Sequence, residues 1–134
     1  MSDSSDAFFT SVGCMDGRVQ ESIAMFGRQK FGAQFPDTIT EAGLVGKLAS
    51  GQIEQSLIDS LKFKIVNVSV GKHHSKGIIV HGHQDCAGHP VDDDLQRQQT
   101  KQAAEFVSSL VSNISVVPVF VEKIDGEWKA RELV

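Results

Sequence analysis

Cysteine is scarce in this sequence, which has only Cys14 and Cys86 among its 134 residues. Two cysteines so far apart do not form the disulfide framework that stabilises small secreted domains. Basic residues are not in excess either, because the formal net charge is −4. This balance argues against a nucleic-acid backbone or an anionic membrane as the main partner, since both attract clustered Lys and Arg.

Long apolar runs are missing as well, and no stretch approaches the roughly 18 residues of a membrane span. The segment MSDSSDAFF (1–9) has neither the basic region nor the apolar core of a signal peptide. We therefore expect a cytoplasmic protein with reduced thiols and no membrane partner. Hydrophobic residues make up 40% of the chain and charged residues 22%, which predicts one globular domain over residues 1–134, with residues 1–6 frayed.

Short β-prone runs alternate with amphipathic segments along the chain. Strands are predicted at 7–13, 37–43 and 76–83, and helices at 18–32, 50–75 and 90–113. The segment 115–134 predicts a strand, a turn at 124–127 and a last strand or tail. This order predicts a single α/β domain with a mainly parallel sheet flanked by helices on both sides, and an antiparallel strand at its C-terminal edge.

Caps and breakers set the expected boundaries. Gly32 is expected to end the first helix. Ser50 is expected to cap the helix 50–75, because apolar residues recur every four positions after it. Pro36 is expected to precede the second strand, and Pro90 suits the start of the last helix.

Each cysteine follows a predicted strand directly. Cys14 comes after the strand 7–13, while His83 and Cys86 come at the end of the strand 76–83. Open α/β sheets place their functional sites at the carboxyl ends of their strands. If these two strands are neighbours in the sheet, the two cysteines and the histidine meet.

Two thiolates and one imidazole are familiar ligands of zinc. Three protein ligands leave a fourth position open, which is the arrangement of catalytic rather than structural zinc sites. Asp16 and Arg18 lie just past Cys14, and an Arg fork can hold a carboxylate in a bidentate pair. Such a carboxylate either accepts a hydrogen bond from a metal-bound water or becomes the fourth ligand.

The segment C-M-D-G-R (14–18), together with H-Q-D-C (83–86), resembles the signatures of the β-class carbonic anhydrases. The order of the elements and the segment ITEAG (39–43) are also similar to that family. The resemblance implies that Cys14, His83 and Cys86 bind Zn²⁺, and that Asp16 and Arg18 form the catalytic dyad. It also implies a homodimer or a higher homo-oligomer.

The activity implied is the reversible hydration of carbon dioxide to bicarbonate by zinc-bound hydroxide. Because two thiolates neutralise the zinc, its water should be less acidic than in a three-histidine site, so activity should rise toward alkaline pH. Two alternatives stay open: a related enzyme acting on carbonyl sulfide or carbon disulfide, and a catalytically silent module that binds zinc or bicarbonate. Leu44 and Ala87 depart from the family pattern; Ala87 favours the silent module, whereas the intact pair of Asp16 and Arg18 opposes it.

The same residues also allow plainer interpretations. The cysteines can be buried thiols beside a core histidine, a disulfide, or a redox dithiol. A structural zinc with Asp16 as a permanent fourth ligand is a further alternative, and Asp16 with Arg18 can be an ordinary ion pair. Asp85 either supports the metal site or caps the next helix, and Trp128 either packs in the hairpin or forms a ligand platform.

Overall fold

The strand β3 (Ile78–His83) forms the centre of the fold, since all six of its residues are buried. A computed structural model describes residues 6–134, so the predicted fraying of residues 1–6 falls, except for Asp6, outside the described residues. The sheet has five strands in the order β2-β1-β3-β4-β5. Three of its pairings are parallel, and the last, between β4 and β5, is antiparallel. The predicted fold class is therefore confirmed.

The elements follow the predicted alternation, with one additional short helix. The strands are β1 (Phe8–Gly13), β2 (Phe35–Thr40), β3 (Ile78–His83), β4 (Val116–Ile124) and β5 (Glu127–Glu132). The helices are α1 (Gln20–Phe31), α2 (Leu44–Ala49), α3 (Gln55–Leu61), the π-helix η1 (Lys62–Val70) and α4 (Asp93–Ser108). Gly32 ends α1 in the left-handed conformation, as its position predicts.

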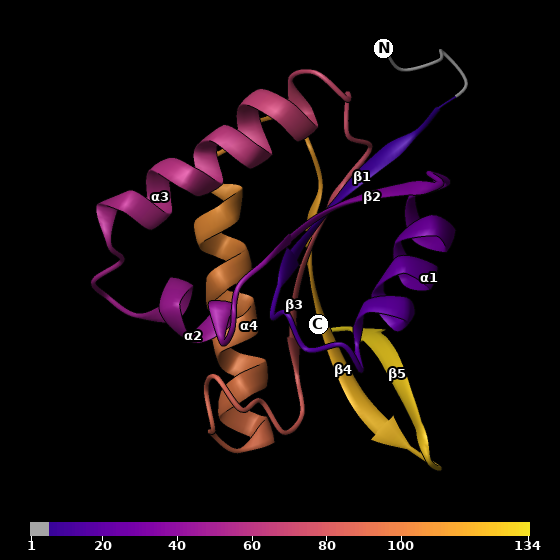
Figure 1. Ribbon diagram of the computed structural model, residues 1–134, viewed down its shortest axis with the longest axis vertical. Coiled ribbons are helices and arrows are strands. Elements are labelled where there is room, and N and C mark those ends of the chain that lie inside the picture. Colours follow the sequence, from indigo (N-terminus) through magenta and orange to yellow (C-terminus); the bar gives the residue numbers. More distant parts are fainter. Residues whose placement is uncertain (1–5) are drawn as a thin grey trace.

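Helices cover both faces of the sheet, with α1 on one face and α2, α3 and α4 on the other (Figure 1). Alternate residues of β3 serve the two faces: Ile78 and Val80 belong to the core under α2–α4, and Ile79 belongs to the core under α1. A strand that packs on both faces needs apolar residues throughout, which explains the unbroken run IIV in its sequence.

Three of the predicted boundaries between β2 and α3 differ from those in the structure. The second strand was predicted at 37–43, but it begins at Phe35, includes Pro36 and ends at Thr40. Proline is tolerated there because β2 is an edge strand. Ser50 does not cap the following helix, since it ends α2. The helix predicted at 50–75 instead begins at Gln55.

The second half of that predicted helix winds more widely than an α-helix. At the end of η1, backbone N–H groups of the following residues reach back five positions into the helix, as in the bonds from Gly71 to Val66 O (2.9 Å) and from His73 to Val68 O (3.0 Å). The predicted helix 90–113 is also shorter than expected, because α4 begins after Asp92 and ends at Ser108. The Asp92 side chain accepts a hydrogen bond from Leu95 N–H and caps α4.

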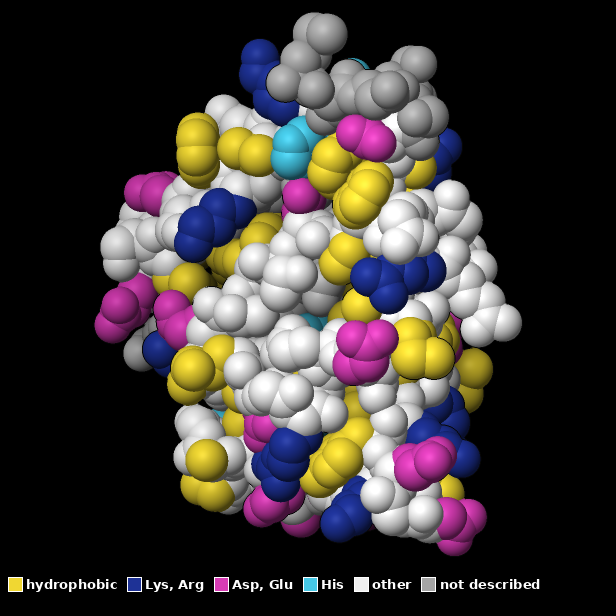
Figure 2. Space-filling view, turned by 45° about the vertical axis from the view of Figure 1, so that its right-hand side comes forward, with side chains coloured by type: hydrophobic (Ala, Val, Ile, Leu, Met, Phe, Trp, Pro, Cys, Tyr) yellow, Lys and Arg dark blue, Asp and Glu magenta, His cyan; other side chains and the backbone are white. Residues whose placement is uncertain are grey.

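The surface carries charges of both signs. On the face shown in Figure 2, Lys and Arg side chains are scattered among Asp and Glu side chains without gathering into one patch. Within residues 6–134, none of the helices combines the length and the apolar character that a membrane crossing requires.

Candidate metal centre

The pairing of β1 with β3 brings the two predicted sequence motifs together. These strands run parallel, with Gly13 opposite His81, so their carboxyl ends lie at the same edge of the sheet. Cys14, His83 and Cys86 meet there, and one ligand atom from each lies within 4.8 Å of the other two. All three residues are buried, with exposed fractions of 5%, 1% and 4%. They form a group that is able to hold a metal ion.

The histidine of this group is oriented by the backbone beside it. His83 Nδ1 lies 2.8 Å from the carbonyl oxygen of Gln84. A carbonyl only accepts hydrogen bonds, so Nδ1 carries a proton, and in the neutral ring Nε2 then holds the lone pair. Nε2 is buried and has no hydrogen-bond partner among the described residues. A neutral imidazole with a free, buried lone pair is the form that binds a metal.

The two thiols face each other within hydrogen-bond distance and do not form a disulfide. Their sulfur atoms are 3.8 Å apart and both cysteines are free, so the disulfide alternative is wrong. The Gly43 N–H donates to Cys14 Sγ at 3.5 Å. Burial and the neighbouring Cys14 raise the pKa of the Cys86 thiol, although the N–H groups of Gly88 and His89 partly oppose this. A bound cation would favour the thiolates that burial disfavours.

The spacing of the sulfur atoms fits tetrahedral zinc. Two Zn–S bonds of about 2.3 Å at the tetrahedral angle place their sulfur atoms about 3.8 Å apart, which matches the distance between Cys14 Sγ and Cys86 Sγ. The set of two thiolates and one imidazole, together with the unpartnered Nε2 of His83, therefore fits a zinc ion.

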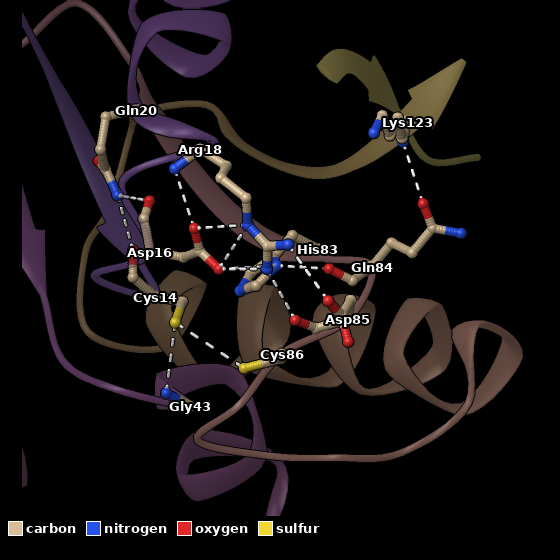
Figure 3. Close-up of polar contacts among 10 residues, drawn as sticks. All are labelled: Cys14, Asp16, Arg18, Gln20, Gly43, His83, Gln84, Asp85, Cys86 and Lys123. Atoms are coloured by element: carbon tan, nitrogen blue, oxygen red, sulfur yellow. Dashed lines mark hydrogen bonds and ion pairs between the residues drawn. The ribbon is translucent and has the colours of Figure 1, made fainter. Parts of the chain in front are cut away.

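A carboxylate stands beside this group, held firmly by an arginine (Figure 3). Arg18 donates to both oxygens of Asp16, from Nη2 to Oδ2 at 2.6 Å and from Nε to Oδ1 at 3.0 Å, and its backbone N–H also donates to Oδ1. These hydrogen bonds from Arg18 lower the pKa of Asp16 to about 2. Asp16 Oδ2 lies 3.9 Å from His83 Nδ1, so the ionised carboxylate is close to the metal-binding group.

The same arginine joins the two loops that carry the possible ligands. Arg18 Nη1 donates to Asp85 Oδ2 at 3.1 Å, and Nη2 donates to the Asp85 carbonyl oxygen at 2.9 Å. The hydrogen bonds that Arg18 donates to Asp16, and then to Asp85, raise the pKa of Arg18. Of the two interpretations of Asp85, support of the site agrees with these contacts, whereas the cap of α4 is Asp92.

Two glycines close the contact between these loops. Gly43 has a φ of +64°, and a Cβ placed on it would lie 2.5 Å from the Gly88 carbonyl oxygen. Only glycine allows this backbone approach. A cavity of about 580 Å³ lies next to the contact, and its lining includes Gly43, Gly88 and His89. Gly88, one of its lining residues, follows Cys86 by two positions in the chain, whereas Cys86 itself does not line this cavity.

Three residues near the site lay outside the predicted set. Gln20 Nε2 donates to the backbone oxygens of Cys14 and Asp16, which folds the loop between them. Gln84 Oε1 accepts from the Lys123 N–H at 3.0 Å, and so links the second loop to β4. Gln84 Nε2 also donates to Asp93 Oδ2 at 3.0 Å. No sequence signal distinguishes these glutamines, since most of their partners are backbone groups. Trp128 packs in the hairpin, as one interpretation predicts, but it also contacts Arg18.

A fold with parallel strands and helices on both faces, and a buried Cys-His-Cys group at its carboxyl edge, defines an α/β protein with a possible metal centre. Residues 4–133 match the model of a protein family described as “Putative carbonic anhydrase”. The chain belongs to this family, whose description names no particular class of carbonic anhydrase. No curated protein and no solved structure matches the chain.

Proposed function

We propose that this protein is a zinc-dependent carbonic anhydrase of the β type, a hydro-lyase that interconverts carbon dioxide and bicarbonate. One observation carries the proposal. Three buried ligand atoms converge from Cys14, His83 and Cys86, and a carboxylate clamped by an arginine stands beside them. Family membership over residues 4–133 supports the same activity.

The roles of the residues follow from their chemistry. Cys14 Sγ, His83 Nε2 and Cys86 Sγ would hold the zinc ion. When bound, zinc acts as a Lewis acid and makes a nucleophile from water near neutral pH. The Asp16 carboxylate, which Arg18 keeps ionised, can accept a hydrogen bond from the attacking water and fix its direction. Arg18 keeps that carboxylate from rotating, because it grips both oxygens.

The number of ligands favours a catalytic over a structural zinc. Among residues 6–134, the group comprises these three residues and does not include Asp16. Structural zinc sites are almost always closed by four protein ligands, whereas catalytic sites keep a position for a reactant. A structural site would also have no use for a carboxylate steered by an arginine.

The proposal also covers the oligomeric state of the protein, its location in the cell and its choice of substrate. The resemblance to β-class enzymes favours a homodimer or a higher homo-oligomer, and the scarcity of cysteine favours the cytoplasm. Carbonyl sulfide and carbon disulfide are related substrates of the same linear shape, and the pocket would have to select among them.

The test is stopped-flow hydration of carbon dioxide by the zinc-loaded protein, from about pH 6.5 to about pH 9. We expect a zinc-dependent rate that climbs with pH. The metal-stripped protein and the Cys86→Ser variant are the controls, and both should stay at the rate of the buffer. No rate above buffer with zinc bound would refute the activity; carbonyl sulfide and carbon disulfide would then be tried, and the silent module would remain if they also failed.

A further inference from the structure

We propose that Trp128 is a positioning residue, which holds Arg18 in place and through it the Asp16 carboxylate. The effect of Trp128 on catalysis rests on the proposed function, whereas the contacts between Trp128 and Arg18 do not. The Cζ atom of Arg18 lies over the Trp128 ring, 4.6 Å from its centroid. This is within the roughly 6 Å over which the face of an indole attracts a cation.

The two kinds of contact restrain Arg18 in different ways. Its N–H groups point to Asp16 on one side and to Asp85 on the other. These hydrogen bonds lie along the edges of the rigid, planar guanidinium, so they fix it within its plane more strongly than perpendicular to that plane. Trp128 lies against the guanidinium at its central carbon and blocks movement of the group in the direction of the ring. The restraint matters because the Arg18 side chain is 41% exposed, and exposed ion pairs hold their geometry poorly on their own.

Trp128 is itself anchored to the frame of the site. Ser22, in α1, donates its hydroxyl hydrogen to the Trp128 carbonyl oxygen. In the neighbouring strand, Lys123 lies opposite Trp128, and its N–H bonds to the side chain of Gln84 (Figure 3). Gln84 also supplies the carbonyl that orients His83. The β4–β5 hairpin thus braces both metal-binding loops, one through Trp128 and one through Lys123.

A packing role and a positioning role make different demands on residue 128. The ring packs against the core under α1, and an aliphatic side chain would satisfy that role. Attraction of a guanidinium requires an aromatic face, which Phe retains and Leu lacks. A comparison of Trp128→Phe with Trp128→Leu therefore separates the two roles.

The first experiment measures hydration of carbon dioxide by zinc-loaded variants, with zinc content and melting temperature recorded for each. Trp128→Leu should lower kcat/KM roughly two- to fivefold at unchanged zinc content, which is the size expected for a partly exposed cation–π contact. Trp128→Phe should keep most of the parent value. Arg131→Leu is the matched control, since Arg131 lies in the same strand but pairs with Glu122. Parent-like rates in Trp128→Leu would overturn the proposal.

The second experiment does not depend on activity. In the NMR spectrum, the Nε–H signal of Arg18, assigned with Arg18→Lys, should be displaced by the ring current of the indole. Trp128→Leu should remove this displacement, and Trp128→Phe should keep part of it. An unchanged Arg18 signal in Trp128→Leu would overturn the positioning role even in an active enzyme. If the parent hydrates no carbon dioxide while the Arg18 signal responds to Trp128, the contact between Trp128 and Arg18 stands and the proposed function is the part that fails.

Discussion

The sulfur atoms of Cys14 and Cys86 lie 3.8 Å apart, although 72 positions separate these residues in the chain. The distance is too long for a disulfide and is close to the separation of about 3.8 Å that tetrahedral zinc imposes on two thiolates. Burial of two thiols so close together is costly when they ionise, and a cation offsets that cost. The first predictions concern this relationship.

Replacement of one thiol should remove the metal. We expect Cys14→Ser to weaken zinc binding more than about 100-fold, beyond the roughly 10- to 100-fold effect of residues outside the ligand set. The melting temperature of the zinc-loaded protein should fall as well, because a ligand that binds only the folded state stabilises it. Metal analysis and thermal unfolding check this, with Met15→Leu as the control at an exposed neighbour. Stoichiometric zinc in Cys14→Ser would show that the ligand assignment is wrong.

Zinc binding should strengthen with pH. The pKa of the Cys86 thiol is raised in the metal-free protein, so below that pKa zinc must displace a proton. Each proton released changes the apparent affinity about tenfold per pH unit. Competition with a chelator at pH 6 and pH 8, values that bracket the region of thiol and imidazole titration, measures the slope. An affinity independent of pH would contradict thiolate ligation.

Asp16→Ala should separate metal binding from catalysis. We expect the variant to keep zinc, because Asp16 is outside the group of three ligands. Its kcat/KM should fall about 100-fold, a typical contribution of a positioned acid–base group. Asp94→Ala is the control, since that carboxylate is 97% exposed and pairs only with Arg97 among the contacts described. Equal rates in Asp16→Ala and the parent would remove Asp16 from the mechanism.

The contact between Gly43 and Gly88 should be sensitive to a single methyl group. Gly43 and Gly32 have nearly the same φ, +64° and +63°, but only at Gly43 would a new Cβ meet backbone, at 2.5 Å. Both alanine variants should lose about 1 kcal/mol of the free energy of unfolding, because alanine is disfavoured in the left-handed conformation. Gly43→Ala should lose more, and should also bind zinc more weakly, because Gly43 N–H donates to Cys14. Urea unfolding and zinc titration test this; equal losses in the two variants would contradict it.

His81 should make the metal-free protein sensitive to acid. Burial, with a smaller effect from His83, lowers the pKa of His81 from 6.5 to about 3. The unfolded chain therefore binds the proton more readily than the folded protein does. The neutral ring contributes its full stability above about pH 6.5. As the pH falls from there toward 3, the free energy of unfolding decreases by about 1.4 kcal/mol per pH unit. Urea unfolding at several pH values should show this slope, and His81→Phe should reduce it. The exposed His74 serves as the control in His74→Gln; equal slopes in His81→Phe and the parent would contradict the assignment.

Local sequence predicted the elements whose stability depends on their own residues. The apolar run before His83 has the composition of a strand buried on both faces, and β3 is one. The region from Glu41 to Val70 was predicted less well. Ser50 has the chemistry of an N-cap, yet it ends α2, because the left-handed Gly43 starts a short helix that buries Leu44, Val45 and Leu48 against the sheet.

The sequence by itself determined the chemistry available at the site. The short spacings between Cys14, Asp16 and Arg18, and between His83 and Cys86, are fixed by the chain, and they supply two separate sets of possible metal ligands, one of them beside a carboxylate that an arginine can clamp. The tertiary structure alone decided which partners meet. The pairing of β1 with β3 joins the two motifs, and the return of the β4–β5 hairpin brings Trp128 to Arg18. These contacts depend on strand order and on the packing of distant segments, and no local pattern encodes either.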